Sequence, residues 1–176
     1  MTTALPRPVA GDVAPYYFGY VDLVASGDVL SILAGGLAET RCALRGIAPE
    51  RETHRYAAGK WSVREVIGHI LDAERVFGNR AFHMARGDQA PLPSMEQDDY
   101  VATGGADRRP LADLFDELEH LRESHLRMFR SFDRETWERV GTAAGVPFRV
   151  RAFPFVLAGH EMHHRRVLVE KYLKGP

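Results

Sequence analysis

The sequence has a single cysteine, no long apolar run and no excess of either charge, and each absence excludes a class of protein. With Cys42 alone, the 176-residue chain excludes an intramolecular disulfide and a thiolate-rich zinc site, so any metal needs imidazole and oxygen ligands. No stretch approaches the roughly 20 apolar residues of a membrane span, and prolines interrupt the start where a signal peptide carries its apolar core. We therefore predict a cytoplasmic protein with no membrane partner.

The charged residues are balanced and interleaved along the chain. Lys and Arg number 23 against 24 Asp and Glu, which gives a formal net charge of −1. The sequence has no basic stripe of the kind that binds phosphates, so we expect no nucleic-acid partner. With 45% hydrophobic residues at this length, one domain can bury a self-sufficient core.

Helical periodicity dominates the chain beyond residue 27. Residues 1–27 hold several aromatic residues without periodicity, and we expect an irregular segment that packs on a single helical domain, residues 28–176. Apolar spacings of three and four predict four long helices, over about 28–45, 62–86, 110–131 and 150–173. Period-two alternation is absent over any useful length. The predicted fold class is therefore all-α, a four-helix bundle.

Local signals place some helix ends and one loop. Ser62 and Glu65 form a capping box at the start of the second helix, and Pro110 takes a favoured first position in the third. Asp133 is expected to cap a short turn, followed by a glycine-containing link over 141–148. Residues 87–109 hold two prolines and a Gly-Gly pair without helical periodicity, so we predict a loop, which at this length is more often functional than not.

Histidines occupy buried-looking positions in the last predicted helix. Within the string HEMHH, residues 160–164, His160 and His164 fall on the apolar stripe and His163 falls off it. Four residues apart on a helix, the two imidazoles project side by side. His69 is a third inward histidine, on the second helix. Because a divalent cation meets the bonding needs of buried imidazoles, these three predict an open three-nitrogen metal site.

Other interpretations of these histidines stay open at this stage. Buried histidines bonded to backbone or water are common, and His125 also lies on an inward stripe and competes for the third ligand position. HEMHH matches the H-E-x-x-H pattern of zinc proteases. Val167 and Glu170, however, stand where the extended metzincin motif needs Gly and His, which argues against a protease.

Three segments of the chain resemble the DinB-like superfamily, including its YfiT-type metal-dependent hydrolases. They are WSVREVIGHILDAERVFGNRAFHMARGD, PLPSMEQDDYV and FVLAGHEMHHRRVLVEKYL, and the resemblance extends from about residue 19 to residue 173. It implies a four-helix bundle of unusual helix order, a homodimer, and one divalent ion, zinc or nickel, on three histidines. Carried over to this sequence, the ligands are His69, His160 and His164.

Three functions compete for such a site. In a metal-dependent hydrolase the ion activates water for attack on a small-molecule substrate, and the candidate catalytic carboxylates are Glu161, Asp72 and Asp98. The resemblance also implies a thiol-dependent S-transferase or isomerase that uses glutathione, mycothiol or bacillithiol. The cationic residues that could bind the carboxylates of such a thiol are Arg75, Arg80, Arg165 and Arg166. A non-catalytic metal-binding stress protein is the third possibility.

Overall fold

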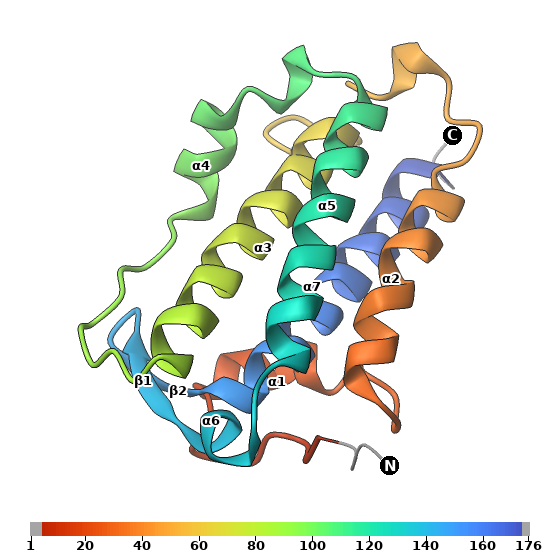
Figure 1. Ribbon diagram of the computed structural model, residues 1–176. Helices are drawn as coiled ribbons and strands as arrows, with labels where there is room; N and C mark the ends of the chain where they lie inside the picture. Colours follow the sequence, from red (N-terminus) through yellow and green to blue (C-terminus); the bar gives the residue numbers. More distant parts are fainter. Residues whose placement is uncertain (1–4, 174–176) are drawn as a thin grey trace.

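The computed structural model describes residues 5–173, and four helices lie side by side in it (Figure 1). The four are α2 (Val29–Ala43), α3 (Val63–Ala85), α5 (Leu111–Arg130) and α7 (Phe153–Val167), the last continuing as the π-helical η5 (Leu168–Leu173). The predicted all-α four-helix bundle is confirmed. Among the described residues, no helix combines the length and the apolar character that a membrane crossing requires.

The four helices do not follow a simple up-and-down order. α2 packs on α5 and α7, and α3 packs on the same two helices, so the consecutive helices α2 and α3 lie on one diagonal of the bundle. α5 and α7 occupy the other diagonal. Helices joined by short loops are normally neighbours, and here the long links 44–62 and 131–152 allow the diagonal placement. This order sets α3 against α7.

Helix ends follow the capping signals of the sequence. The Ser62 hydroxyl accepts from the Glu65 amide at 3.0 Å and the Glu65 carboxylate accepts from the Ser62 amide at 2.8 Å, which completes the predicted capping box. Asp28 caps α2, and Asp133 caps α6 (Arg134–Glu138) as predicted. Pro110 is an exception, because it is the N-cap of α5 with an extended ψ of 144° and not the first helical residue.

Two segments predicted to be irregular contain regular structure. The 87–109 loop includes α4 (Gln97–Gly104) and η3 (Ala106–Arg108), and the 141–148 link forms the hairpin β1 (Val140–Ala143) and β2 (Val146–Arg149). α4 buries only one residue, so it has no apolar stripe to detect. The hairpin strands are four residues long and turn at Ala144–Gly145, both at positive φ, without the Asn-Gly or Asp-Gly signal of such turns.

The N-terminal segment is also more ordered than predicted. Residues 5–27 include η1 (Pro15–Tyr17) and α1 (Phe18–Val21), which are too short for periodicity to reveal. α1 packs on α7. The two remaining 3₁₀ turns are η2 (Pro49–Arg51) and η4 (Val150–Ala152).

Asp12 ties the N-terminal segment to the residues that precede α7. It is 2% exposed, and its carboxylate accepts hydrogen bonds from Arg149 at 2.6 Å and Arg151 at 2.7 Å. Burial by itself raises the pKa of Asp12. The bonds from the Val9 amide and the two arginines outweigh burial and hold the pKa below the usual 3.8.

Replacing Asp12 by asparagine is expected to lower the free energy of unfolding by about 1.5–3 kcal/mol at pH 7, the range for hydrogen bonds to a charged group. Because the folded-state pKa is depressed, this stabilisation is present above pH 3.8 and is lost as the pH falls through the folded-state value. Urea unfolding of wild type and Asp12→Asn between pH 7 and pH 3 measures the difference in their free energies of unfolding, which should decrease as the pH falls. Asp22→Asn is the control, because Asp22 lies in an exposed ion pair with Arg7. A stability difference between wild type and Asp12→Asn that does not change with pH would contradict the prediction.

The apolar core is divided into two clusters along the length of the bundle. On α5, Leu118 belongs to one cluster and Leu126 to the other, with the buried Arg122 between them. Along α7 and its continuation η5, the first cluster ends at Ala158 and the second begins at Leu168. The buried polar side chains at this middle level are Thr40, His69, Glu74, Arg122, His160 and Glu161. The candidate site and an ion-pair network therefore share one polar layer between two apolar ones.

Candidate metal centre

Three histidines from two neighbouring helices converge in this polar layer. His69 comes from α3, and His160 and His164 lie one turn apart on α7. His69 and His160 are 3% and 5% exposed, and His164 is partly exposed. Beside them, Gly159 lets α1 approach, since a Cβ there would lie 2.0 Å from the Tyr20 carbonyl oxygen. The structure brings together the three histidines that the sequence analysis proposed as metal ligands.

The Nε2 atoms of the three histidines face one another. The His160 Nε2 lies 3.0 Å from the His69 Nε2 and 3.1 Å from the His164 Nε2, and one ligand atom of each residue lies within 4.8 Å of the others. An imidazole nitrogen carries either one hydrogen or one lone pair in its plane, so the His160 nitrogen cannot satisfy both neighbours. A cation accepts all three lone pairs at once. Ligand nitrogens at 2.0–2.1 Å from a tetrahedral ion lie about 3.3 Å apart, close to the spacing found here.

Burial keeps these imidazoles neutral. Desolvation is the largest cause for all three, and it lowers the pKa of His69 to about 4 and that of His164 to about 3. The pKa of His160 lies well below the usual 6.5, because its two neighbours add repulsion to the effect of burial. Neutral imidazole is the form that ligates a metal, so the three donors are in the binding state at neutral pH.

Trp61 orients two of the three rings by packing. Its ring centroid lies 4.7 Å from that of His69 and 6.3 Å from that of His164, and its plane is inclined by 27° to the His164 ring. The His69 Nδ1 is buried without a hydrogen-bond partner among the described residues. In metal-bound histidines the N–H of this second ring nitrogen usually donates a hydrogen bond to an oxygen atom. In this protein the His69 ring is positioned by its contact with the Trp61 ring.

Two of the cavities at the histidine cluster have different walls. A cavity of about 350 Å³ is lined by His164, Trp61 and Asp98, and a second of about 160 Å³ is lined by His69, His160 and Arg80. Gln97, the first residue of α4, lines both cavities. The 87–109 segment therefore shapes pockets at the histidines and does not seal them.

The three carboxylates predicted as catalytic candidates have different surroundings. Asp98 is exposed and lines the larger cavity with His164. Asp72 lines a small space of about 50 Å³ behind His69 and pairs with Arg75 at 2.9 Å. Glu161 is 1% exposed, and its carboxylate accepts from Thr40 at 2.7 Å and Arg122 at 2.9 Å. Glu161 thus belongs to the buried ion-pair network.

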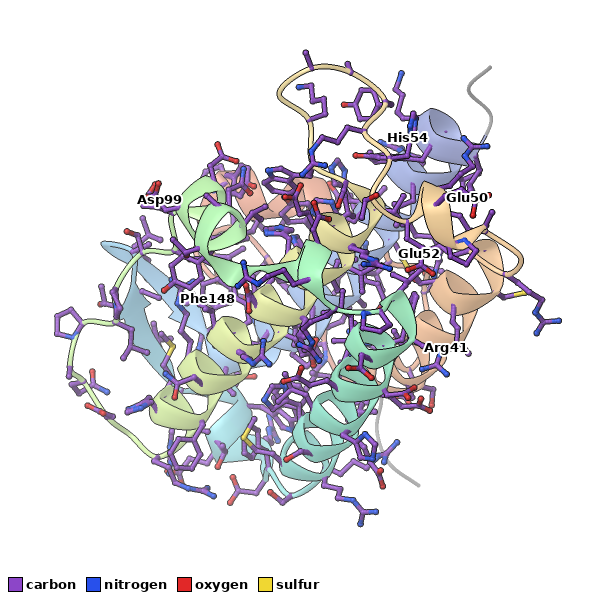
Figure 2. The ribbon with its side chains drawn as sticks, turned by 90° about the horizontal axis from the view of Figure 1, so that it is seen from above. Arg41, Glu50, Glu52, His54, Asp99 and Phe148 are labelled. Atoms are coloured by element: carbon purple, nitrogen blue, oxygen red, sulfur yellow. The ribbon has the colours of Figure 1, made fainter. Side chains whose placement is uncertain are left out.

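The remaining histidines lie outside the cluster. His125 is 3.0 Å from the Glu74 carboxylate through its Nδ1 and is not among the converging ligands. His163 packs beside Tyr20 and lines the larger cavity. His54 is exposed on the link between α2 and α3, and Figure 2 shows it on that link and Asp99 on α4.

Comparison with known protein families identifies the family of this chain. The family model described as the DinB superfamily matches residues 33–168. The chain belongs to the DinB superfamily. The resemblance inferred from the histidine motifs and the W-S-x-x-E helix start is thereby confirmed.

Solved structures show the same DinB fold. YfiT from Bacillus subtilis, described as a probable metal-dependent hydrolase with an unusual four-helix bundle topology, is 14% identical with a TM-score of 0.74, covering 84% of this chain and 87% of that chain. The mycothiol-dependent maleylpyruvate isomerase is 13% identical with a TM-score of 0.66, covering 83% of this chain and 61% of that chain. At these identities the likeness concerns the fold alone. A comparison of the sequence with curated proteins finds no significant match.

The DinB bundle of this chain carries a buried ion-pair network that sequence reasoning missed. The Arg122 guanidinium donates to both oxygens of Glu74 at 3.0 and 2.9 Å and to Glu161 at 2.9 Å. Glu74 and Arg122 were detectable in the sequence as charged residues within apolar helical stripes. Glu74 follows Ile67 and Ile70 at helical spacing, and Arg122 follows Leu118.

The four arginines predicted as thiol-binding candidates are not equivalent. Arg75 pairs with Asp72 and Glu117, and Arg165 pairs with Glu39. Arg166 is exposed and lines a cavity that includes none of the three clustered histidines. Arg80 is 4% exposed and lines the cavity of His69 and His160.

Proposed function

We propose that this DinB-superfamily protein is a divalent-metal-dependent hydrolase that holds one zinc or nickel ion on His69, His160 and His164. The observation that carries the proposal is the convergence of three neutral imidazole nitrogens without a fourth His, Cys, Asp or Glu ligand among the described residues. Structural zinc sites are closed by four protein ligands, whereas catalytic sites keep a position for water or substrate. A catalytic ion therefore fits this donor set better than a structural one.

A small-molecule substrate fits the cavities at the histidines. When bound, the ion supplies Lewis acidity and lowers the pKa of a water molecule toward neutrality. Asp98, exposed on the cavity wall beside His164, is the carboxylate best placed to accept a proton from that water. Trp61 holds His69 and His164 in place and covers them on one side. The homodimer and the cytoplasmic location stay predictions.

A thiol-dependent transferase or isomerase is the second candidate. It is supported by the fold shared with the mycothiol-dependent isomerase and by Arg80, a cation on the wall of the His69 cavity. In that case a low-molecular-weight thiol takes the open position in place of water. The two candidates share the metal site and differ in the nucleophile.

Protein purified without a nickel column is expected to contain about one zinc or nickel ion per chain by plasma mass spectrometry. The loaded protein should hydrolyse small activated esters, chelation should reduce the rate to that of buffer, and added zinc or nickel should restore it. Asp98→Asn should lower the rate about 100-fold with the metal content unchanged, as expected for loss of a general base.

Two outcomes decide against the hydrolase. Turnover that requires added glutathione, mycothiol or bacillithiol would identify the thiol-dependent reaction. A folded protein that stays metal-free after incubation with zinc and nickel would remove both candidate enzymes and leave the histidines as core residues.

A further inference from the structure

Arg80 is a buried cation without a carboxylate partner. It is 4% exposed, and no described Asp or Glu oxygen lies within 4.0 Å of its nitrogens. One Nη2 hydrogen bond goes to the Pro93 carbonyl oxygen at 2.5 Å, and the guanidinium stacks over the Phe77 ring at 5.4 Å. A guanidinium has five N–H donors, so these contacts leave most of its hydrogen-bonding capacity free.

The other fully buried arginine of the chain is neutralised. Arg122, 2% exposed, is paired with the two carboxylates of Glu74 and Glu161. Burial of an unpaired charge is costly, and proteins normally offset it with an opposite charge and hydrogen bonds. The absence of such a partner at Arg80, among the residues that the structure describes, indicates that the opposite charge comes from a ligand.

The cavity beside Arg80 favours one negative charge. Its volume is about 160 Å³, and the wall includes His69 and His160, three tyrosines and Gln97, with no acidic residue. Arg80 is the only Lys, Arg, Asp or Glu side chain on this wall. A single guanidinium balances a carboxylate monoanion better than a phosphate dianion, and its planar fork matches the carboxylate in two parallel hydrogen bonds.

We infer that Arg80 binds the carboxylate of a small organic-acid substrate whose reacting group lies at the open position of the three-histidine site. The binding of a carboxylate rests on Arg80 alone. The placement of the reacting group at the three-histidine site rests on the proposed metal-dependent function. It narrows the substrate class to small carboxylic acids and their esters, amides or thio-derivatives that retain a free carboxylate. Arg80 is thus a specificity-determining residue.

The test uses cobalt-loaded protein and pairs of thiols that differ only in charge. Mercaptoacetate, 3-mercaptopropionate and 4-mercaptobutyrate are compared with their neutral amides by titrating the thiolate-to-cobalt absorption band. The best carboxylate is expected to bind wild type about 10- to 100-fold more tightly than its amide, the range of a charge-assisted hydrogen bond. In Arg80→Met this ratio should fall to about one while the amide affinity is unchanged.

A matched control and a metal-free arm separate the possible failures. Arg86 is an exposed arginine on the C-terminal cap of α3 that stacks over Phe82 at 5.3 Å, and Arg86→Met should keep the wild-type ratio. In metal-free protein, butyrate, a carboxylate monoanion, should raise the midpoint of thermal unfolding of wild type and Arg86→Met but not of Arg80→Met. Failure of cobalt to bind would count against the proposed function, and the butyrate measurement would still test Arg80.

Several results would overturn the inference. They are equal affinities for acid and amide in wild type, a butyrate effect that survives Arg80→Met, and stronger stabilisation by inorganic phosphate than by butyrate. Should Arg80→Met not fold, Arg80→Lys replaces it. The single ammonium cannot form the two-pronged contact, so the preference should fall several-fold, and an unchanged preference would overturn the inference.

Discussion

Replacing His160 by alanine is expected to abolish metal binding. Its Nε2 is the central atom of the cluster, within 3.1 Å of the nitrogens of both other histidines. Loss of a residue that merely orients a ligand typically costs 10- to 100-fold in metal affinity, so loss of a ligand should cost more than about 100-fold. Plasma mass spectrometry should find about one ion per chain in wild type and a trace in His160→Ala and His69→Ala.

His163→Ala is the matched control for this prediction. It makes the same chemical change on the same helix, at a ring that packs against Tyr20 and offers no nitrogen to the cluster. Its metal content should equal that of wild type. Added zinc should raise the unfolding midpoint of wild type and His163→Ala but not of His160→Ala. Full metal content in His160→Ala would contradict the three-histidine site.

Replacing Arg122 by leucine is expected to lower the free energy of unfolding by about 3–5 kcal/mol at pH 7. Glu74 and Glu161 are each 1% exposed, and the substitution leaves both buried without their cation. Burial raises the pKa of Glu74, but Arg122 and His125 outweigh it in wild type and lower that pKa below 4.5. In Arg122→Leu the buried Glu74 carboxyl group should protonate more readily, so the stability difference from wild type should narrow as the pH falls toward and then below 4.5.

Two further variants make the Arg122 prediction specific. Arg127→Leu makes the same change on α5 at an exposed pair with Glu123 and should leave stability unchanged within error. Replacing Glu74, Arg122 and Glu161 together by apolar residues should recover much of the loss, because no uncompensated charge then remains buried. Urea unfolding with circular dichroism measures all four proteins. A loss below about 1 kcal/mol in Arg122→Leu would contradict the network's role.

The helices and part of the candidate site were predictable because they depend on local spacing. The capping box at Ser62 and the apolar stripes placed three of the four bundle helices within two residues of their observed bounds. The side-by-side projection of His160 and His164 follows from their separation by about one helical turn. Neither inference needs any knowledge of how the helices pack.

Coverage of a helix by irregular segments was not predictable. Arg80 lies on α3, and arginine side chains are mostly solvent-exposed. In the folded chain, Ser94 and Met95 and the tyrosines of the N-terminal segment line the same cavity as Arg80 and enclose it. Such segments carry no periodicity, so their position against a helix is decided by tertiary contacts alone.

By itself, the sequence determined the helices, the histidine pair on α7 and the resemblance that led to the DinB superfamily. Helical periodicity alone did not decide whether His69 or His125 completes the pair, since both lie on inward stripes, and only the DinB resemblance named His69. The tertiary structure decided this through helix order: α3, which carries His69, packs against α7, whereas α5, which carries His125, lies diagonally across the bundle from it. His125 accordingly meets Glu74, and His69 meets His160. Periodicity specifies which side of a helix faces inward, and only packing specifies which helix it faces.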